Sequence, residues 1–137
     1  MGPCLNSSQQ LILLKPFSKD EIKAAIFSIP NHKSPRLNGY LSGFFKSTSN
    51  TIGVDICTAI MGFFETTKIT HEWNCTNIDL IPKAPNPATA MDYRPISCCN
   101  TLYKGISKLL SSRLRGILPT VVHPNQSAFI KLSLIHI

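Results

Sequence analysis

The chain has 137 residues, of which 43% are hydrophobic, and a formal net charge of +7 at pH 7. This is about the length of one domain, with enough apolar side chains for a core, so the composition excludes an intrinsically disordered chain. The excess of positive charge favours an anionic partner, most simply a nucleic acid.

The positive charge is concentrated in the last third of the sequence. No Asp or Glu follows Asp92, whereas several basic residues do: Arg94, Lys104, Lys108, Arg113, Arg115 and Lys131. The five cysteines are odd in number and form no Cys-x-x-Cys pair, so we expect an intracellular protein, nuclear or cytoplasmic, that is not secreted. Cys98 and Cys99 are expected to be small buried side chains, because no spacing of metal ligands recurs.

In chain order, residues 1–15 show no periodic pattern beyond the apolar run at 11–14, and we treat them as an extension. That run is too short to cross a bilayer and follows no basic segment, so neither a signal peptide nor a membrane partner is expected. Ser18 and Glu21 form a capping box. Apolar residues then follow at helical spacing, which predicts a helix ending at Pro30.

Residues 31–39 form a basic loop rich in turn-forming residues, and 51–65 are expected to form a second long helix. Four aromatic residues near this helix are interpreted as core, because they accompany aliphatic residues at helical spacing: Phe44, Phe45, Phe63 and Phe64. Trp73 is expected to cover the edge of the core. Residues 76–81 alternate in polarity and 94–97 are expected to be extended, which predicts a hairpin with a long loop.

A third helix is predicted from about Thr101 to Gly116. Its apolar residues share one face, whereas Lys104, Lys108 and Arg115 lie within about 40° of one another on the opposite face. Three like charges in a row indicate a surface that faces a polyanion, although an ordinary solvated face would show the same pattern. Arg113 falls on the apolar face and needs a carboxylate from the earlier helices or from additional chain.

Many residues in order resemble the reverse transcriptase region of plant non-LTR (LINE-type) retrotransposons, over about residues 16–130. They are Pro16-Phe17, Glu21-Ile22, Lys33-Ser34-Pro35, Asn38-Gly39-Tyr40, Phe44-Phe45-Lys46, Asn74, Thr76, Leu80-Ile81-Pro82-Lys83, Tyr93-Arg94-Pro95-Ile96-Ser97-Cys98-Cys99-Asn100, Leu102-Tyr103-Lys104, Ile106-Ser107-Lys108, Arg113-Leu114 and Asn125-Gln126-Ser127-Ala128-Phe129. The resemblance implies an α+β fold: a truncated fingers region and the start of the palm (16–130), mostly helical with a small antiparallel hairpin. Residues 131–137 form a tail that departs from the family.

The resemblance further implies that Lys83 and Arg94 bind template backbone and the incoming nucleoside triphosphate, with Lys33 in the loop as a further candidate. Gln126 matches a segment expected to align template or substrate. With Lys104, Lys108 and Arg115 on the third helix, these residues are the candidate nucleotide- and template-binding set. The implied partners are an RNA template, a DNA primer, a deoxynucleoside triphosphate and the remainder of the polymerase.

Nucleotidyl transfer uses two metal ions about 4 Å apart, held by clustered carboxylates. The seven Asp and Glu residues of this chain are scattered in the sequence, so we expect no catalytic or metal-binding residue here and magnesium only in the full-length enzyme. Two alternatives stay open. The basic stripe on the third helix allows a stand-alone nucleic-acid-binding module, and the departures from the family at 36–38 and 132–137 favour a non-functional relic of a decayed element.

Overall fold

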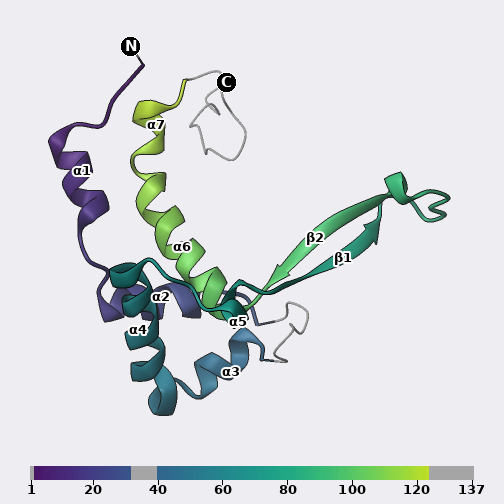
Figure 1. Ribbon diagram of the computed structural model, residues 1–137, viewed down its shortest axis with the longest axis horizontal. Coiled ribbons are helices and arrows are strands. Elements are labelled where there is room, and N and C mark those ends of the chain that lie inside the picture. Colours follow the sequence, from purple (N-terminus) through teal and green to yellow (C-terminus); the bar gives the residue numbers. More distant parts are fainter. Residues whose placement is uncertain (1, 32–39, 124–137) are drawn as a thin grey trace, which may run out of the picture.

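The structure, a computed structural model, describes residues 2–31 and 40–123. Its helices form one body, and a two-stranded antiparallel hairpin projects away from that body (Figure 1). The fold is α+β and mostly helical, as predicted. The elements are α1 (Ser7–Leu14), α2 (Lys19–Phe27), α3 (Ser42–Ser47), α4 (Ser49–Thr66), α5 (His71–Asn74), β1 (Thr76–Pro82), the 3-10 helix η1 (Ala90–Asp92), β2 (Tyr93–Cys99), α6 (Thr101–Arg115) and α7 (Leu118–Val121). No described helix is long and apolar enough to cross a membrane.

The three helices predicted from the sequence are present as α2, α4 and α6. The capping box begins α2 as expected: the Glu21 N–H donates to Ser18 Oγ at 3.2 Å, and the Ser18 N–H donates to Glu21 Oε2 at 2.8 Å. Asn100 begins α6, where its side-chain oxygen accepts from the Tyr103 N–H at 2.8 Å. In both cases a side chain satisfies a backbone donor that the first helical turn leaves without a partner.

Residues 1–15, expected to be an extension without a regular element, contain α1. The helix begins at a capping box of Asn6 and Gln9, the signal that pattern analysis missed. None of its residues is buried, and Leu11 and Leu14 are exposed. Because α1 buries no apolar face, its sequence carries no helical periodicity.

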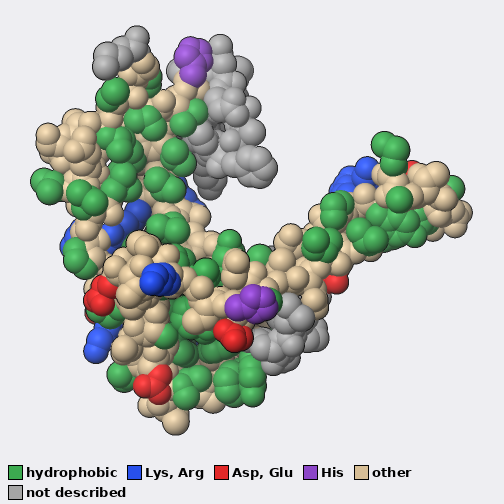
Figure 2. Space-filling model, in the orientation of Figure 1, with side chains coloured by type: hydrophobic (Ala, Val, Ile, Leu, Met, Phe, Trp, Pro, Cys, Tyr) green, Lys and Arg blue, Asp and Glu red, His purple; other side chains and the backbone are tan. Residues whose placement is uncertain are grey.

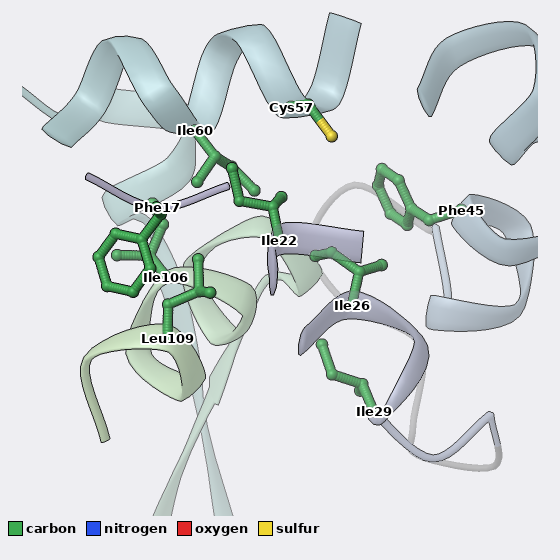
Figure 3. Close-up of a cluster of buried hydrophobic side chains, with 9 residues drawn as sticks. All are labelled: Phe17, Ile22, Ile26, Ile29, Phe45, Cys57, Ile60, Ile106 and Leu109. Atoms are coloured by element: carbon green, nitrogen blue, oxygen red, sulfur yellow. The ribbon is translucent and has the colours of Figure 1, made fainter. Parts of the chain in front are cut away.

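The core lies where α2, α4 and α6 meet (Figure 3). Nine buried side chains form it: Phe17, Ile22, Ile26, Ile29, Phe45, Cys57, Ile60, Ile106 and Leu109. Phe63, Phe64 and Trp73 are partly buried against this cluster, as predicted. Phe44 is an exception, because it is exposed and stacks on Tyr40 with ring centroids 4.5 Å apart.

Gly105 allows α2 and α6 to approach closely. A Cβ atom at this position would lie 2.5 Å from Cδ1 of Ile26, whose side chain is buried in the core. The helix that carries the basic residues is therefore fixed against α2 by a contact in which any larger side chain would force Ile26 to move.

The hairpin pairs β1 with β2 from Thr76 opposite Cys99 to Pro82 opposite Tyr93. Every residue of β1 is exposed. Apolar side chains are exposed on both faces, since Ile78 and Leu80 lie on one face and Ile81 on the other. In the described part of the chain, no second layer covers either face of the hairpin.

The prediction that Cys98 and Cys99 are buried is wrong. Both are half-buried on β2, because the hairpin has no covering layer. The Cys98 thiol donates to the Asp79 carboxylate at 3.1 Å, across the two strands. All five cysteines are free thiols.

Candidate nucleic-acid interface

Lys83 and Arg94 lie close to the loop end of the hairpin. Arg94 is opposite Ile81 in the strand register, and Lys83 follows β1, where its N–H donates to the carbonyl oxygen of Asp92 at 2.8 Å. Side chains two residues apart on a strand share a face, so Lys83 and Arg94 project from the same face as diagonal neighbours. Figure 2 shows basic side-chain atoms in this region, next to apolar side chains. Both residues are exposed.

The loop beyond these residues is held by hydrogen bonds of its own. Oδ2 of Asp92 accepts from the N–H groups of Ala88 and Thr89 at 3.0 and 2.8 Å, and from the Thr89 hydroxyl at 3.0 Å. The Thr89 N–H, followed by the Ala88 N–H, holds the pKa of Asp92 below its usual value. Lys83 Nζ donates to the carbonyl oxygen of Met91 at 2.8 Å. Asp92 thus organises the loop, and in the described residues no carboxylate forms an ion pair with Lys83 or Arg94.

The α6 cations lie along a groove between α2 and α6. Lys108 and Arg115 border one hollow of this groove, and Lys104 and Lys108 border the next. Lys108 Nζ donates to the carbonyl oxygen and the hydroxyl of Ser28 at 3.1 and 2.8 Å, at the end of α2. The structure therefore brings the three α6 candidates to one surface and the hairpin pair to another.

Arg113 makes structural contacts within the helical body. Its side chain is 10% exposed, and its guanidinium carbon lies 3.5 Å from the centre of the Phe17 ring. Nη2 lies 3.7 Å from a carboxylate oxygen of Glu21, which confirms that its acidic partner comes from an earlier helix. The guanidinium also donates to the backbone carbonyl oxygens of Leu13, Lys15 and Pro16. Arg113 fastens the segment before α2 to α6.

Glu21 is held mainly by its own helix cap. The backbone N–H of Ser18 lowers the pKa of the Glu21 carboxyl most, and the Ser18 hydroxyl and Arg113 lower it further, against a raising effect of burial. Since 46% of the Glu21 side chain is exposed, its ion pair with Arg113 is a weak one.

Two of the sequence candidates, Lys33 and Gln126, lie outside the described residues. Among the residues that the structure describes, no three His, Cys, Asp or Glu side chains come together in a group that could hold a metal ion.

The residues that fix the hairpin to the helices, and the serines that line the groove, were not predicted from the sequence. The side chain of Asn100 is buried and donates to the carbonyl oxygens of Glu72 and Trp73 at 3.2 and 2.8 Å, so it fixes the base of the hairpin to α5. Its place before the third helix, typical of a helix N-cap, was the available signal. Ser28 and Ser111 line the groove, and no sequence pattern distinguishes them from ordinary exposed serines.

Comparison with known proteins finds a similarity to one transposon protein. It is 30% identical over 125 residues to the transposon TX1 uncharacterized 149 kDa protein of Xenopus laevis. The aligned part is 91% of this chain but 10% of that protein, so the chain spans about a tenth of the length of the curated relative it matches. No family model matches the chain. The similarity indicates a transposon-related origin.

Proposed function

We propose that this chain is the fingers region and the start of the palm of a LINE-type reverse transcriptase, of the lineage known from plants. In this role the hairpin binds the incoming deoxynucleoside triphosphate and the backbone of the RNA template. The observation that carries the proposal is the pair of exposed cations, Lys83 and Arg94, on one face near the end of a projecting hairpin. The similarity to a transposon protein over most of the chain supports the same origin.

The two side chains suit a triphosphate. A guanidinium binds phosphate oxygens with two parallel hydrogen bonds, whereas an ammonium acts as a mobile point charge. Among the described residues, the Lys83 ammonium donates to a backbone carbonyl and Arg94 is exposed, so each can turn to an anion without breaking an ion pair there. The loop held by Asp92 sets the direction in which the pair projects.

The described carboxylates do not fit a magnesium site, because no three of the candidate ligand groups come together. We therefore assign no metal-dependent step to these residues and propose that the metal ions and the DNA primer are held by the remainder of the polymerase. Incubated with primed RNA, nucleotides and magnesium, this chain alone is expected to extend no primer.

Binding of a fluorescent deoxynucleoside triphosphate, followed by anisotropy, tests the proposal. Losing one charged hydrogen bond weakens the free energy of binding by about 1.5 kcal/mol, which raises Kd roughly tenfold. The variants Lys83→Ala and Arg94→Ala should each weaken binding by that amount. Lys68→Ala is the matched control, since Lys68 is an exposed cation on a different part of the chain. If the hairpin variants bind the triphosphate as well as Lys68→Ala does, the proposal is wrong.

A stand-alone nucleic-acid-binding module is the second candidate, and the basic side of α6 favours it. It differs from the polymerase proposal in one measurable respect. A binding module would retain single-stranded nucleic acid while showing no affinity for a free triphosphate.

A further inference from the structure

We infer that the groove between α2 and α6 binds the sugar-phosphate backbone of a single-stranded nucleic acid without reading its bases. This α2–α6 groove consists of two hollows, of about 420 and 240 Å³, which share Lys108 and Ser111. The inference rests on the proposed function in one respect, that the chain binds nucleic acid. It assigns that binding to a surface separate from the hairpin.

The lining of the α2–α6 groove has the chemistry of a phosphate site. On its α2 side two alanines lie between Glu21 and Ser28, and the cations come from α6. The larger hollow is lined by Glu21, Ala24, Ala25, Ser28, Lys108, Leu109, Ser111, Ser112 and Arg115. The smaller hollow adds Lys104 and Ser107. Serine hydroxyls, lysine and arginine are the side chains that most often bind phosphate oxygens.

Lys108 is held in place at the centre of the groove. An ammonium has three N–H donors, and two of them are directed to the carbonyl oxygen and hydroxyl of Ser28. The third is available for a phosphate oxygen of a bound strand. Because Lys108 is already ordered by Ser28, less side-chain entropy is lost when a phosphate binds.

The spacing of the cations suits a stacked single strand. Lys104 and Arg115 are eleven residues apart on α6, which at 1.5 Å per residue is about 16 Å. A stacked single strand carries one phosphate per 3.4 Å or so, so about five phosphates fit along this length. The groove is a recess between two helices, whereas a duplex has a convex surface, so we expect it to take a single strand.

The lining also indicates what the groove does not recognise. It contains no aromatic side chain among the described residues, so bases have no stacking platform. One carboxylate, that of Glu21, lines the larger hollow, where it accepts from the Ser18 N–H and lies 3.7 Å from Arg113. The net charge along the groove remains positive. Binding should therefore depend on backbone charge and little on base sequence.

Anisotropy titrations of labelled 12-nucleotide single strands at several salt concentrations test the inference. For single strands, log affinity falls by about 0.7 per decade of salt for each phosphate neutralised. Arg115→Ala should therefore reduce the slope by about 0.7 and raise Kd about fivefold at 0.1 M salt. Ser111→Asp, which places a negative charge in the groove, should weaken binding further. Lys68→Ala is the matched control and should leave both quantities unchanged.

The outcomes separate this inference from the proposed function. If Arg115→Ala and Ser111→Asp bind like Lys68→Ala while Lys83→Ala and Arg94→Ala lose the strand, the groove inference is wrong and the hairpin proposal stands. If the groove variants lose the strand and the hairpin variants still bind triphosphate normally, the groove inference stands and the hairpin proposal is wrong. Equal affinity for a polyglutamate peptide or for duplex of the same length would overturn the assignment to single-stranded nucleic acid.

Discussion

Replacing Arg113 should destabilise the chain more than replacing any exposed cation. In Arg113→Ala, the backbone carbonyl oxygens of Lys15 and Pro16 lose their donor, and the Phe17 ring loses the guanidinium stacked on it. Those two carbonyls belong to exposed residues, so water replaces the donor and each lost hydrogen bond counts as its net value of about 1 kcal/mol. The cation–π contact adds about 1 kcal/mol, and the exposed ion pair with Glu21 adds little.

The sum is a loss of about 3 kcal/mol in the free energy of unfolding. With an m-value of about 1.5 kcal/mol/M in urea, the unfolding midpoint should fall by about 2 M. Circular dichroism during urea titration measures this shift. Arg113→Lys keeps the charge, but an ammonium lacks the planar fork by which a guanidinium reaches several acceptors at once. This variant should therefore recover only part of the lost stability.

The matched control is Arg115→Ala, two residues further along the same helix. Arg115 is exposed, and such a substitution changes stability by less than about 0.5 kcal/mol. If Arg113→Ala lowers the midpoint no more than Arg115→Ala does, then the contacts of Arg113 do not hold the segment before α2, and the reasoning above is refuted.

Two further predictions concern α2 and the helix glycines. Because the pKa of Glu21 is lower in the folded chain than in the unfolded one, its contribution to stability is present above pH about 4.3 and is lost as pH falls through the folded pKa. Urea midpoints measured from pH 6 to pH 3 should fall less steeply for Glu21→Gln, and equal slopes would contradict the role of the cap. Gly105→Ala should destabilise by about 1 to 2 kcal/mol, because the clash with Ile26 outweighs the gain in helix propensity. Gly62→Ala, where the added Cβ meets nothing within 4 Å, should instead stabilise the chain by about 0.5 kcal/mol. If both substitutions change stability in the same direction, the close approach of α2 to α6 does not exclude a side chain at Gly105.

The elements that bury an apolar face were predictable from the sequence, and those that do not were missed. The helices α2, α4 and α6 all contribute to the core, and that burial imposes the 3.6-residue period by which they were found. Helix α1 buries nothing and leaves no such period. Alternating polarity predicted β1, although both of its faces are exposed. The burial predicted for Cys98 and Cys99 was wrong because no second layer covers the hairpin in the described residues.

The candidate site was predictable only in part, for a similar physical reason. Charge and helical period placed Lys104, Lys108 and Arg115 on one side of α6, and the structure confirms that they share a surface. The second wall of that surface comes from α2, 80 residues earlier at Ser28, and no local pattern reveals which serine faces a distant lysine. The internal use of Arg113 was anticipated from its place on the apolar face, whereas its backbone acceptors were not.

The exposed hairpin gives the chain two parts of unequal local stability. An isolated pair of strands in water is only marginally stable. Among the described residues, Asn100 joins the base of the hairpin to the helical body. The hairpin can therefore open locally while the nine-residue core stays intact, because none of those core residues lies on a strand. A ligand that binds the far end of β1 and β2 must therefore also order the hairpin. Part of its binding free energy is used for that ordering.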